Sequence, residues 1–591
     1  MGQKILEAHC DEEGTDDALV EVRVDQVILA KEPNRVLGAA VEAGLTAAVP
    51  EVAIAYPPYC VSIGDEDSDP RAAHRVPHEA LSLGLLVAQP GAGFASTVHL
   101  ERFASPTRLS LSDDSRLASS GAVGMLNLPA SRSQLAQALI SGTTQVRVPC
   151  SIQINIAGRL RPFVCVRDAA LELTRRGLKQ AILNADTRHH APVILEFAGP
   201  SLKYFSVSER AVFASLAHQL GAAGALFPSD EKTETFLRDQ RRSKAHRALH
   251  ADAGASYDET ISIDLASIEP LVLDESGRIR PIRELDGLAV SQVLLGGDSG
   301  ISLRDVFAAA ALLKSKRAEP SVEFLFCPPS RQVLELLSRS DALASLLATG
   351  ARLIEPDRRA MSGLLYKTAE TDAQLRNADR DSGAHALVAS AESLAFAIAH
   401  GEVGDPRKFK RPVRVTVPRA LPTDDVLLVR GRDARGGARG KGRVDKRLED
   451  APVSVTSDSF APPPNHEEWT EAVELNVTSS RATHDGPSAF VAESIEDIQW
   501  LLDNTSDLPS LRAIVAGHIP AAAVSILSGL GILALRADEA GIARLTQAKV
   551  LRVPARTSWE GDALSLIADE QQIDVEWLAR GAERQWTSKD E

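Results

Sequence analysis

The chain has 591 residues, of which 44% are hydrophobic, 25% are charged and only 4% are aromatic, and its formal net charge is -15. This length and apolar content predict several buried cores, and the acidic balance argues against sequence-independent binding to nucleic acid or to an anionic membrane. No apolar run approaches the ~18 residues of a membrane-spanning helix, and the acidic N-terminal segment does not resemble a secretory signal. We therefore expect a cytoplasmic protein whose partner is a small-molecule substrate or metabolite, with no nucleic acid and no membrane, and we leave its oligomeric state open.

Strand-like and helix-like segments alternate along the chain, which is the pattern of α/β layers. Strands are expected at 20–30, 49–56, 83–89 and 191–199, and helices at 133–142, 167–177 and 209–224. From residue 290 a β-α-β-α alternation follows, with strands at 290–297 and 322–330 and helices at 303–316 and 331–340. A Gly- and Arg-rich run at 430–447 predicts a loop, because it has almost no apolar residue to pack, and a smaller α/β unit follows it.

The five cysteines are scattered along the chain without a Cys-x-x-Cys spacing: Cys10, Cys60, Cys150, Cys165 and Cys327. Such scatter argues against a disulfide framework and against a structural zinc or iron–sulfur site. We expect most of them to be buried thiols.

Several long blocks resemble the aconitase superfamily, most closely its isopropylmalate isomerase and homoaconitase branch, in order and in spacing. They are GAGFASTVHLERFASP (91–106), LSDDSRLASSGAVGML (111–126), LLGGDSGISLRDVFAAAALLKSK (294–316), LVASAESLAFAIAHGEVGDPRKF (387–409) and LRAIVAGHIPAAAVSILSGLGILAL (511–535). The resemblance implies an α/β, aconitase-like fold with three α/β domains around a central cleft and a C-terminal swivel domain. It divides the chain into domains 1 and 2 at 1–285, domain 3 at 286–410, a linker leading into the swivel domain at 411–450, and the swivel domain at 451–591.

The family's chemistry resides in a 4Fe-4S cluster held by three thiolates, and the residues that match those positions are different here. Asp298 matches the first cysteine, and Arg358 and Met361 match the pair in the later Cys-Gly-x-Cys block. A guanidinium cannot ligate iron and a thioether is a weak ligand. We therefore predict that the cluster is absent and that the chain uses no cofactor and no metal.

The resemblance also places other residues where the family has acid–base groups. Pro58 and Tyr59 match an Asp-His pair, Ser96 and Arg116 match two histidines, and Ala30 matches a glutamine. Asp114 and Ser115 keep the family's residue types. Arginine cannot act as a proton carrier near neutral pH, so the family's own hydration reaction is not expected.

Part of the family's anion-binding set has counterparts in this chain. Arg376 and, with an offset of one, Arg380 match an Asn-Arg-Asn block, and Asp424 follows Thr423 as in the family's Thr-Asp pair. The family's serine–arginine loop matches either Ser479 to Arg481 or, with better spacing, the segment 486–490. In the second case the serine and the arginine are lost.

Two main hypotheses follow from this pattern, beside a weaker third, RNA binding of the kind known for some aconitase relatives. In the first, the chain is a cluster-free enzyme that catalyses a non-redox lyase, isomerase or cyclisation reaction on a small molecule, for instance in secondary metabolism. Its candidate catalytic residues are Asp114, Ser115, Arg116, Asp298, Tyr59 and Ser96, and its candidate substrate-binding residues are Arg376, Arg358, Arg380, Arg481 and Asp424. In the second, it is a pseudoenzyme that binds a metabolite or stabilises a partner. Asp298 and Arg358 then form an ion pair that fills the space of the cluster.

Overall fold

The computed structural model describes most of the chain as α/β layers and one barrel. The described residues are 1–10, 19–57, 76, 79–361, 365–366, 373–377, 386–418, 421–423, 425–431, 443–444, 469, 471–479, 486–504, 508, 510–559, 561–569, 571–580 and 583–586. Within these ranges every helix is too short or too polar to cross a bilayer.

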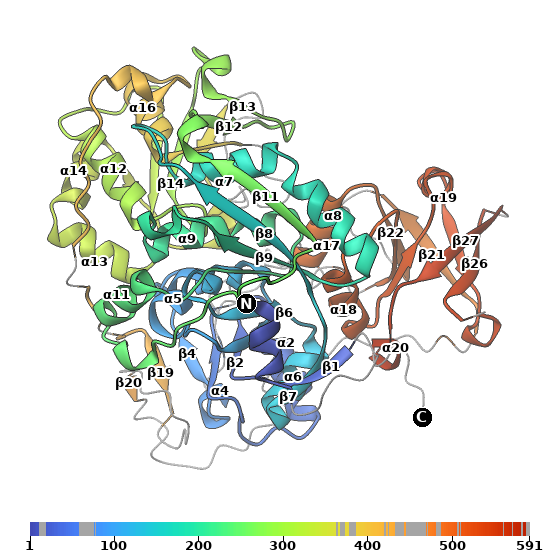
Figure 1. The fold of residues 1–591 in the computed structure, drawn as a ribbon. Helices are drawn as coiled ribbons and strands as arrows, with labels where there is room; N and C mark the ends of the chain where they lie inside the picture. The colour runs from blue at the N-terminus through green and yellow to red at the C-terminus, as the bar shows by residue number, and fades with distance from the viewer. Residues whose placement is uncertain are drawn as a thin grey trace.

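The first sheet has seven strands in the order β20-β19-β4-β3-β2-β5-β6. Its strands are β2 (Gln26–Leu29), β3 (Val52–Ala55), β4 (Leu86–Ala88), β5 (Leu109–Ser112), β6 (Leu126–Pro129), β19 (Leu428–Arg430) and β20 (Arg443–Val444). Strands β2 to β6 pair in parallel, and β19 adds antiparallel to β4, so that a late segment lies beside an early one (Figure 1). The run 430–447, predicted as a loop, therefore contains β20.

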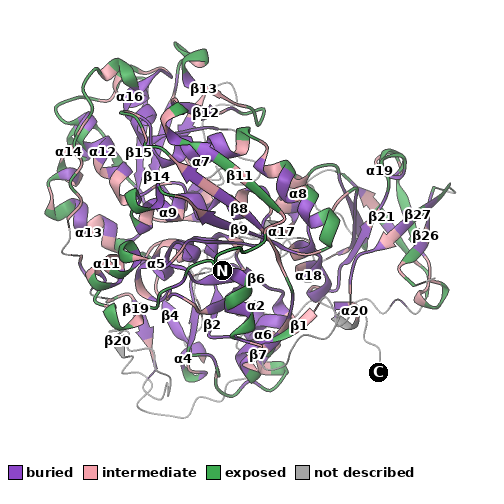
Figure 2. Ribbon diagram, viewed as in Figure 1, coloured by how far each residue is buried: buried purple, intermediate pink, exposed green. Residues whose placement is uncertain are grey.

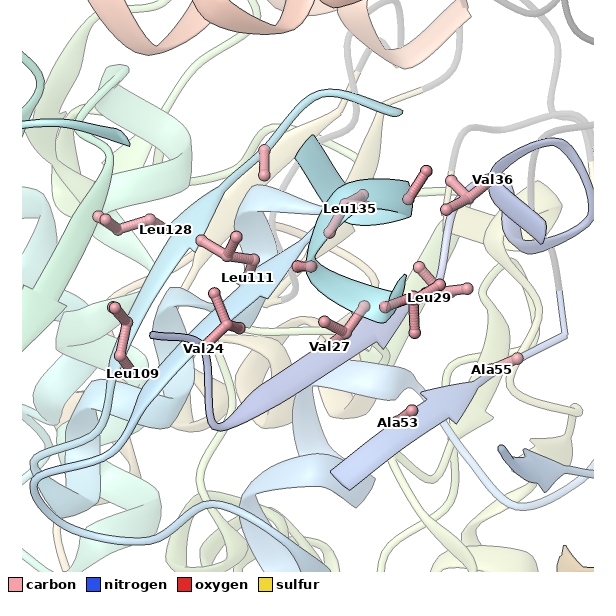
Figure 3. Packing of buried hydrophobic residues seen from close by; sticks show 14 of the residues in the cluster. Val24, Val27, Leu29, Val36, Ala53, Ala55, Leu109, Leu111, Leu128 and Leu135 are labelled. Carbon is pink, nitrogen blue, oxygen red and sulfur yellow. The ribbon is translucent and has the colours of Figure 1, made fainter. Parts of the chain in front are cut away.

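One face of this sheet packs on two helices, α2 (Pro33–Glu42) and α6 (Arg132–Ser141). Figure 3 shows Val36 and Leu135 of these helices above the strand residues Val27, Leu29 and Leu111. The strand predicted at 20–30 is in fact two strands. The chain turns at Asp25, whose carboxylate accepts the amide of Leu109, and residues Leu19–Arg23 form β1, which pairs with β7 (Thr143–Arg147) instead.

The second sheet is parallel, in the order β10-β9-β8-β11. Its strands are β8 (Cys150–Ala157), β9 (Val193–Ala198), β10 (Gly224–Leu226) and β11 (Glu259–Asp264), and its helices are α7 (Val166–Arg175), α8 (Leu178–His189), α9 (Val207–Ala214) and α10 (Leu216–Leu220). A nine-residue 3-10 helix, η1 (Ser115–Val123), joins the first two sheets. Gly121 is required there, because a Cβ on it would lie 1.7 Å from the carbonyl oxygen of Ala225 in β10.

The third sheet has the order β13-β12-β18-β17-β14-β15-β16. Its strands are β12 (Leu271–Leu273), β13 (Ile279–Pro281), β14 (Gln292–Gly296), β15 (Glu323–Cys327), β16 (Arg352–Leu353), β17 (Gln374–Arg376) and β18 (Leu387–Ala389). The helices around it are α12 (Leu303–Leu313), α13 (Arg331–Arg339), α14 (Ala342–Thr349), α15 (Arg358–Met361) and α16 (Ala391–His400). The predicted β-α-β-α order from residue 290 is confirmed, and β12 and β13 join this sheet from before residue 286.

The C-terminal part is a closed barrel in the order β21-β22-β23-β24-β27-β26-β25. Its elements are β21 (Val473–Thr478), β22 (Ser488–Ala492), α17 (Ile495–Asn504), β23 (Leu511–Ala516), α18 (Ala521–Gly529), β24 (Leu533–Arg536), α19 (Glu539–Leu545), β25 (Val550–Val553), β26 (Ala563–Ala568), β27 (Gln571–Trp577) and α20 (Glu583–Trp586). Figure 1 shows the barrel in red at one side of the body formed by the three sheets, and Figure 2 shows that both parts have buried interiors.

The barrel is fixed to the body by buried polar contacts. Arg147 of β7 donates from Nε to Glu583 Oε1 at 2.8 Å and from Nη2 to the carbonyl oxygen of Leu578 at 3.1 Å. The Glu583 side chain is fully buried, and it also accepts the hydroxyl of Ser525. Helix α18 packs closely on α6, since a Cβ on Gly529 would lie 2.2 Å from Cβ of Ser131.

Candidate functional site

Five of the predicted site residues form one buried network at the carboxyl ends of β5 and β14. Asp114 is the N-cap residue of η1, directly after β5, and its carboxylate accepts the backbone amide of Arg116 at 3.0 Å and the Arg116 guanidinium at 3.2 Å. Asp298 follows β14 and accepts Nη1 of Arg358 at 2.8 Å. Its other oxygen accepts the hydroxyl of Ser96, from helix α5 (Ala95–Arg102). The ion pair that the sequence suggested between Asp298 and Arg358 is thus confirmed.

The charges of this network balance each other. Burial opposes ionisation of Asp114, yet the guanidinium groups of Arg116 and Arg358 hold its pKa below the usual value. Burial raises the pKa of Asp298 above the usual value, against the opposing effect of the same two arginines. All four side chains are at most 8% exposed, so two carboxylates and two guanidiniums share a volume that is closed to water.

The donor set around Asp298 does not fit a 4Fe-4S cluster. Among the described residues, the sulfur groups near Asp298 are the thiol of Cys327, at the end of β15, and the thioether of Met361, and both belong to an apolar cluster with Phe94 and Ile354. Burial raises the pKa of Cys327 to about 12, so its sulfur stays protonated. Among the residues that the structure describes, no group of three His, Cys, Asp or Glu ligand atoms converges at this network.

Arg376 is also buried at the end of a strand, and two of its polar contacts are with neighbouring protein groups. Its Nη1 donates to the carbonyl oxygen of Met361 at 2.5 Å, and its Nη2 donates to Oε1 of Gln374 at 3.1 Å. The side chain is 2% exposed. It therefore ties β17 to the end of α15, next to the Asp298–Arg358 pair, and its role in substrate binding stays a prediction.

One polar pair in this region was not predicted from the sequence. The hydroxyl of Ser115 lies 2.7 Å from Nδ1 of His218, on α10, and both residues are partly exposed. The backbone carbonyl of His218 accepts Nε2 of Gln499 from α17 at 3.0 Å, so the barrel contacts the same helix. His218 lies in an apolar helical segment, and nothing in its sequence context signals the contact with a residue 103 positions earlier.

Other polar groups near the site have structural roles. Asp113 accepts the backbone amides of Ala30, Lys31 and Glu32, at 2.6 to 3.0 Å, and thereby fixes the chain after β2. His99 joins Oε1 of Gln26 at 2.8 Å and the hydroxyl of Tyr56 at 3.4 Å, and burial lowers its pKa to about 3. His99 is therefore neutral, and its contacts with Gln26 and Tyr56 hold the interior of the first sheet together.

Four of the predicted site residues lie outside the described residues: Tyr59, Arg380, Asp424 and Arg481. Ser479 is described and lies exposed just after β21. The alternative segment begins at Gly486 and leads into β22. The match to the family's serine–arginine loop stays open between the two.

Comparison with known proteins assigns this architecture to a class. Residues 72–284 match the Aconitase family (aconitate hydratase). The chain is 28% identical to "3-isopropylmalate dehydratase large subunit 2" of Archaeoglobus fulgidus over 331 residues, which is 54% of this chain and 77% of the relative. It is 31% identical over 281 residues, 47% of this chain and 61% of the relative, to "3-isopropylmalate dehydratase large subunit 1" of Deinococcus radiodurans.

The Thermotoga maritima "3-isopropylmalate dehydratase large subunit 1" is 26% identical over 340 residues, covering 55% of this chain and 79% of the relative. A crystal structure of Thermococcus kodakaraensis aconitase X (holo-form) covers 70% of this chain and 95% of its own at 11% identity, but its TM-score of 0.39 is too low to support an argument. The fold and the family match define an aconitase-type α/β protein. Residues 72–284 carry an Aconitase family domain, and the relatives named 3-isopropylmalate dehydratase large subunit support the aconitase superfamily and its isopropylmalate isomerase branch.

Proposed function

We propose that this chain is an aconitase-family enzyme that works without an iron–sulfur cluster and catalyses a non-redox lyase, isomerase or cyclisation reaction on a small molecule. The observation that carries the proposal is the contact between Ser115 and His218, 2.7 Å apart and partly exposed at the start of η1. This pair joins an imidazole to a hydroxyl, and both residues are partly exposed, unlike the buried pairs Ser96–Asp298 and Tyr56–His99. The family supports the reaction class, because the relatives are named dehydratases.

Independence from a cluster is supported by the residues at the matching positions. Asp298 and Arg358 are bonded to each other, and the nearby sulfur groups of Cys327 and Met361 do not amount to three thiolates. The proposed reaction uses proton transfer by side chains of the chain. An imidazole has an unperturbed pKa near 6.5, so it can accept and return a proton near neutral pH, which a guanidinium cannot.

In the proposed mechanism His218 is the proton carrier and Ser115 is the group through which it acts. Nδ1 of His218 either accepts the Ser115 hydroxyl proton or donates its own to Ser115 Oγ, depending on its tautomer. A hydroxyl so placed can pass a proton to or from a substrate carbon or oxygen at the exposed side of the pair. Asp114, next to Ser115 in the sequence, lies close enough to His218 for the imidazole to be among the groups that lower the pKa of Asp114, after burial, Arg116 and Arg358.

A second function is favoured by the closure of the network itself. Ser96 and Arg358 both bond to Asp298, and all three residues are buried. This is expected if the residues that match the family's reaction centre now only stabilise the interior. In this alternative the chain is a pseudoenzyme that binds a metabolite or stabilises a partner, and the Ser115–His218 pair only joins η1 to α10.

The two functions are separated by a proton-exchange experiment. The protein is purified anaerobically and its iron and sulfide are measured. It is then incubated in D2O with a panel of small 2-hydroxy acids and their unsaturated dehydration products, and deuterium incorporation is followed by NMR. The enzyme proposal expects no stoichiometric iron, exchange on at least one compound, and a rate about 10²- to 10⁴-fold lower in His218→Gln and Ser115→Ala.

The control is His189→Gln, which changes an exposed histidine bonded to Asp258 at the outside of the body. Its rate should equal that of the unchanged protein. Stoichiometric iron and sulfide would overturn the cluster-free proposal. Exchange that survives both site variants would remove Ser115 and His218 from the mechanism, and a complete lack of exchange together with saturable binding of one compound would favour the pseudoenzyme.

A further inference from the structure

A second polar cluster lies away from the Asp114–Arg358 network, where three helices begin. Cys165 is the N-cap residue of α7, Asp305 lies in the first turn of α12, and Glu392 lies in the first turn of α16. The Cys165 sulfur and one oxygen from each carboxylate all lie within 4.8 Å of one another. Figure 1 shows α7, α12 and α16 in the same upper part of the body, and all three residues are buried.

Helix capping accounts for only part of this cluster. Oδ2 of Asp305 accepts the amide of Ser302 at 2.9 Å and its hydroxyl at 2.7 Å, which completes a capping box. Oδ1 of Asp305 and Oε2 of Glu392 accept no hydrogen bond among the described residues, although the two side chains are only 2% and 4% exposed. A buried carboxylate oxygen without a partner costs free energy, so these two atoms need a further explanation.

The positively charged side chain nearest to these two carboxylates is Arg304, and its position leaves room for a second cation. Its Nη1 lies 3.7 Å from Asp305 Oδ1 and 3.7 Å from Glu392 Oε1, which is beyond the 2.7–3.2 Å of an N–H···O hydrogen bond. The Arg304 side chain is 38% exposed and lines a cavity of about 400 Å³ together with Glu392, Arg161, Phe163, Tyr204 and Val413. The guanidinium therefore borders the cavity and pairs with both carboxylates only at long range.

We propose that Cys165, Asp305 and Glu392 bind a divalent transition-metal ion such as Zn²⁺, with the fourth coordination position open to the adjoining cavity. One sulfur and two oxygens are a donor set that Zn²⁺ accepts, and three protein ligands with one open position are the arrangement of zinc sites that bind an exogenous ligand. Ligand atoms around a tetrahedral ion lie roughly 3.3–3.8 Å apart given the bond lengths, so only small side-chain rotations are needed. The proposal does not depend on the proposed function above.

The charges are consistent with this assignment. With the thiol deprotonated, the three ligands carry three negative charges, which Arg304 and a divalent ion together offset, while Asp168 and Glu209 are further carboxyl groups in the neighbourhood. Metal binding releases the thiol proton to water.

The test titrates the full chain with Co²⁺ and with Zn²⁺ by calorimetry and absorption spectroscopy. We expect one equivalent of each ion to bind, and the Co²⁺ form to show a thiolate-to-metal charge-transfer band with intense tetrahedral ligand-field bands. In Cys165→Ser the charge-transfer band should vanish. Loss of a direct ligand should weaken binding at least as much as the roughly 10- to 100-fold that loss of an outer partner costs.

Cys150→Ser is the matched control, because Cys150 is a partly buried thiol on β8 outside the cluster. It should bind both ions with unchanged affinity and spectrum. Glu392→Gln keeps the size of the side chain, so it should fold and unfold at a similar temperature without metal while losing the thermal stabilisation by Zn²⁺. The proposal is wrong if no equivalent binds, if the Co²⁺ spectrum lacks the sulfur band, or if the band persists in Cys165→Ser.

Discussion

Replacing Arg358 by methionine is the sharpest test of how the buried network is held together. The Asp298 and Arg358 side chains are 3% and 8% exposed, and their charged atoms are 2.8 Å apart. Unit charges ~4 Å apart attract each other by about 4 kcal/mol at an effective dielectric constant near 20. Removing one partner of a buried pair typically costs about 3–5 kcal/mol, because the remaining charge has no compensation. We expect Arg358→Met to lower the free energy of unfolding of the body by that amount.

A double-mutant cycle separates the pair from its surroundings. Asp298→Asn leaves Arg358 with the neighbouring Asp114, so its cost should be smaller than that of Arg358→Met. The double variant leaves neither charge behind, and it should lose about 1–3 kcal/mol less than the sum of the two single variants. If Arg358→Met does not fold, Arg358→Lys replaces it in the cycle, because lysine keeps the positive charge and perturbs the pair less.

The tryptophans make the measurement specific. All five lie at or beyond residue 469, so tryptophan fluorescence follows the barrel, while far-ultraviolet circular dichroism follows the whole chain. A chain of several domains does not unfold in one two-state step, so the body transition in urea is read by circular dichroism and by amide exchange in β14 and β15. The barrel transition should not move. Additive effects of the two single variants, or a cost below about 1 kcal/mol for Arg358→Met, would show that Asp298 and Arg358 are not an energetically coupled pair that stabilises this interior.

Three further predictions concern the scaffold around the site. Arg147→Ala removes the guanidinium that pairs with the buried Glu583 carboxylate and should destabilise the barrel, read by tryptophan fluorescence in urea, by about 3–5 kcal/mol with little change in the body. The pKa of His99 is about 3 in the folded chain and 6.5 when exposed, so the unfolded state binds more protons between these values. Stability should therefore fall as the pH drops below about 6.5, by about 2 kcal/mol at pH 5, and urea midpoints of His99→Gln should show a correspondingly smaller loss. Gly121→Ala should abolish folding or destabilise strongly, because its Cβ would overlap a carbonyl oxygen of β10, whereas Gly517→Ala, with open space around it, should be near neutral by circular dichroism and yield.

Local patterns in the sequence predicted the layers but not how the layers are joined. The alternation from residue 290 gave β14, α12, β15 and α13 correctly, because each apolar run has the length and period of its element. The pairing of β19 with β4 was not predicted, because strands more than 300 residues apart meet there through contacts that no local period encodes. The split of the predicted strand 20–30 into two strands was not predicted either. It involves a hydrogen bond between Asp25 and Leu109, which are far apart in the sequence, so no local pattern signals it.

The same distinction holds at the site. The Asp298–Arg358 pair was predictable, because two charges at positions that the family brings together need each other in a buried interior. His218 and the Cys165–Asp305–Glu392 cluster were not. Capping patterns such as Ser302 with Asp305 mark where one helix begins, but they do not reveal that three helix starts converge.

The position of His218 links the barrel to the chemistry proposed for the body. Helix α10 ends against α17, where Gln499 donates to the backbone carbonyls of His218 and Gln219. The barrel is held in place at a different point, by Arg147 and Glu583. If the Ser115–His218 pair carries protons, its geometry depends on how the barrel is docked, and loosening the barrel should lower catalysis even though no reacting group is changed. If the pair is only a link between η1 and α10, the same loosening changes stability alone. The enzyme and the pseudoenzyme therefore differ in whether a change at the barrel contact, far from the site, lowers catalysis.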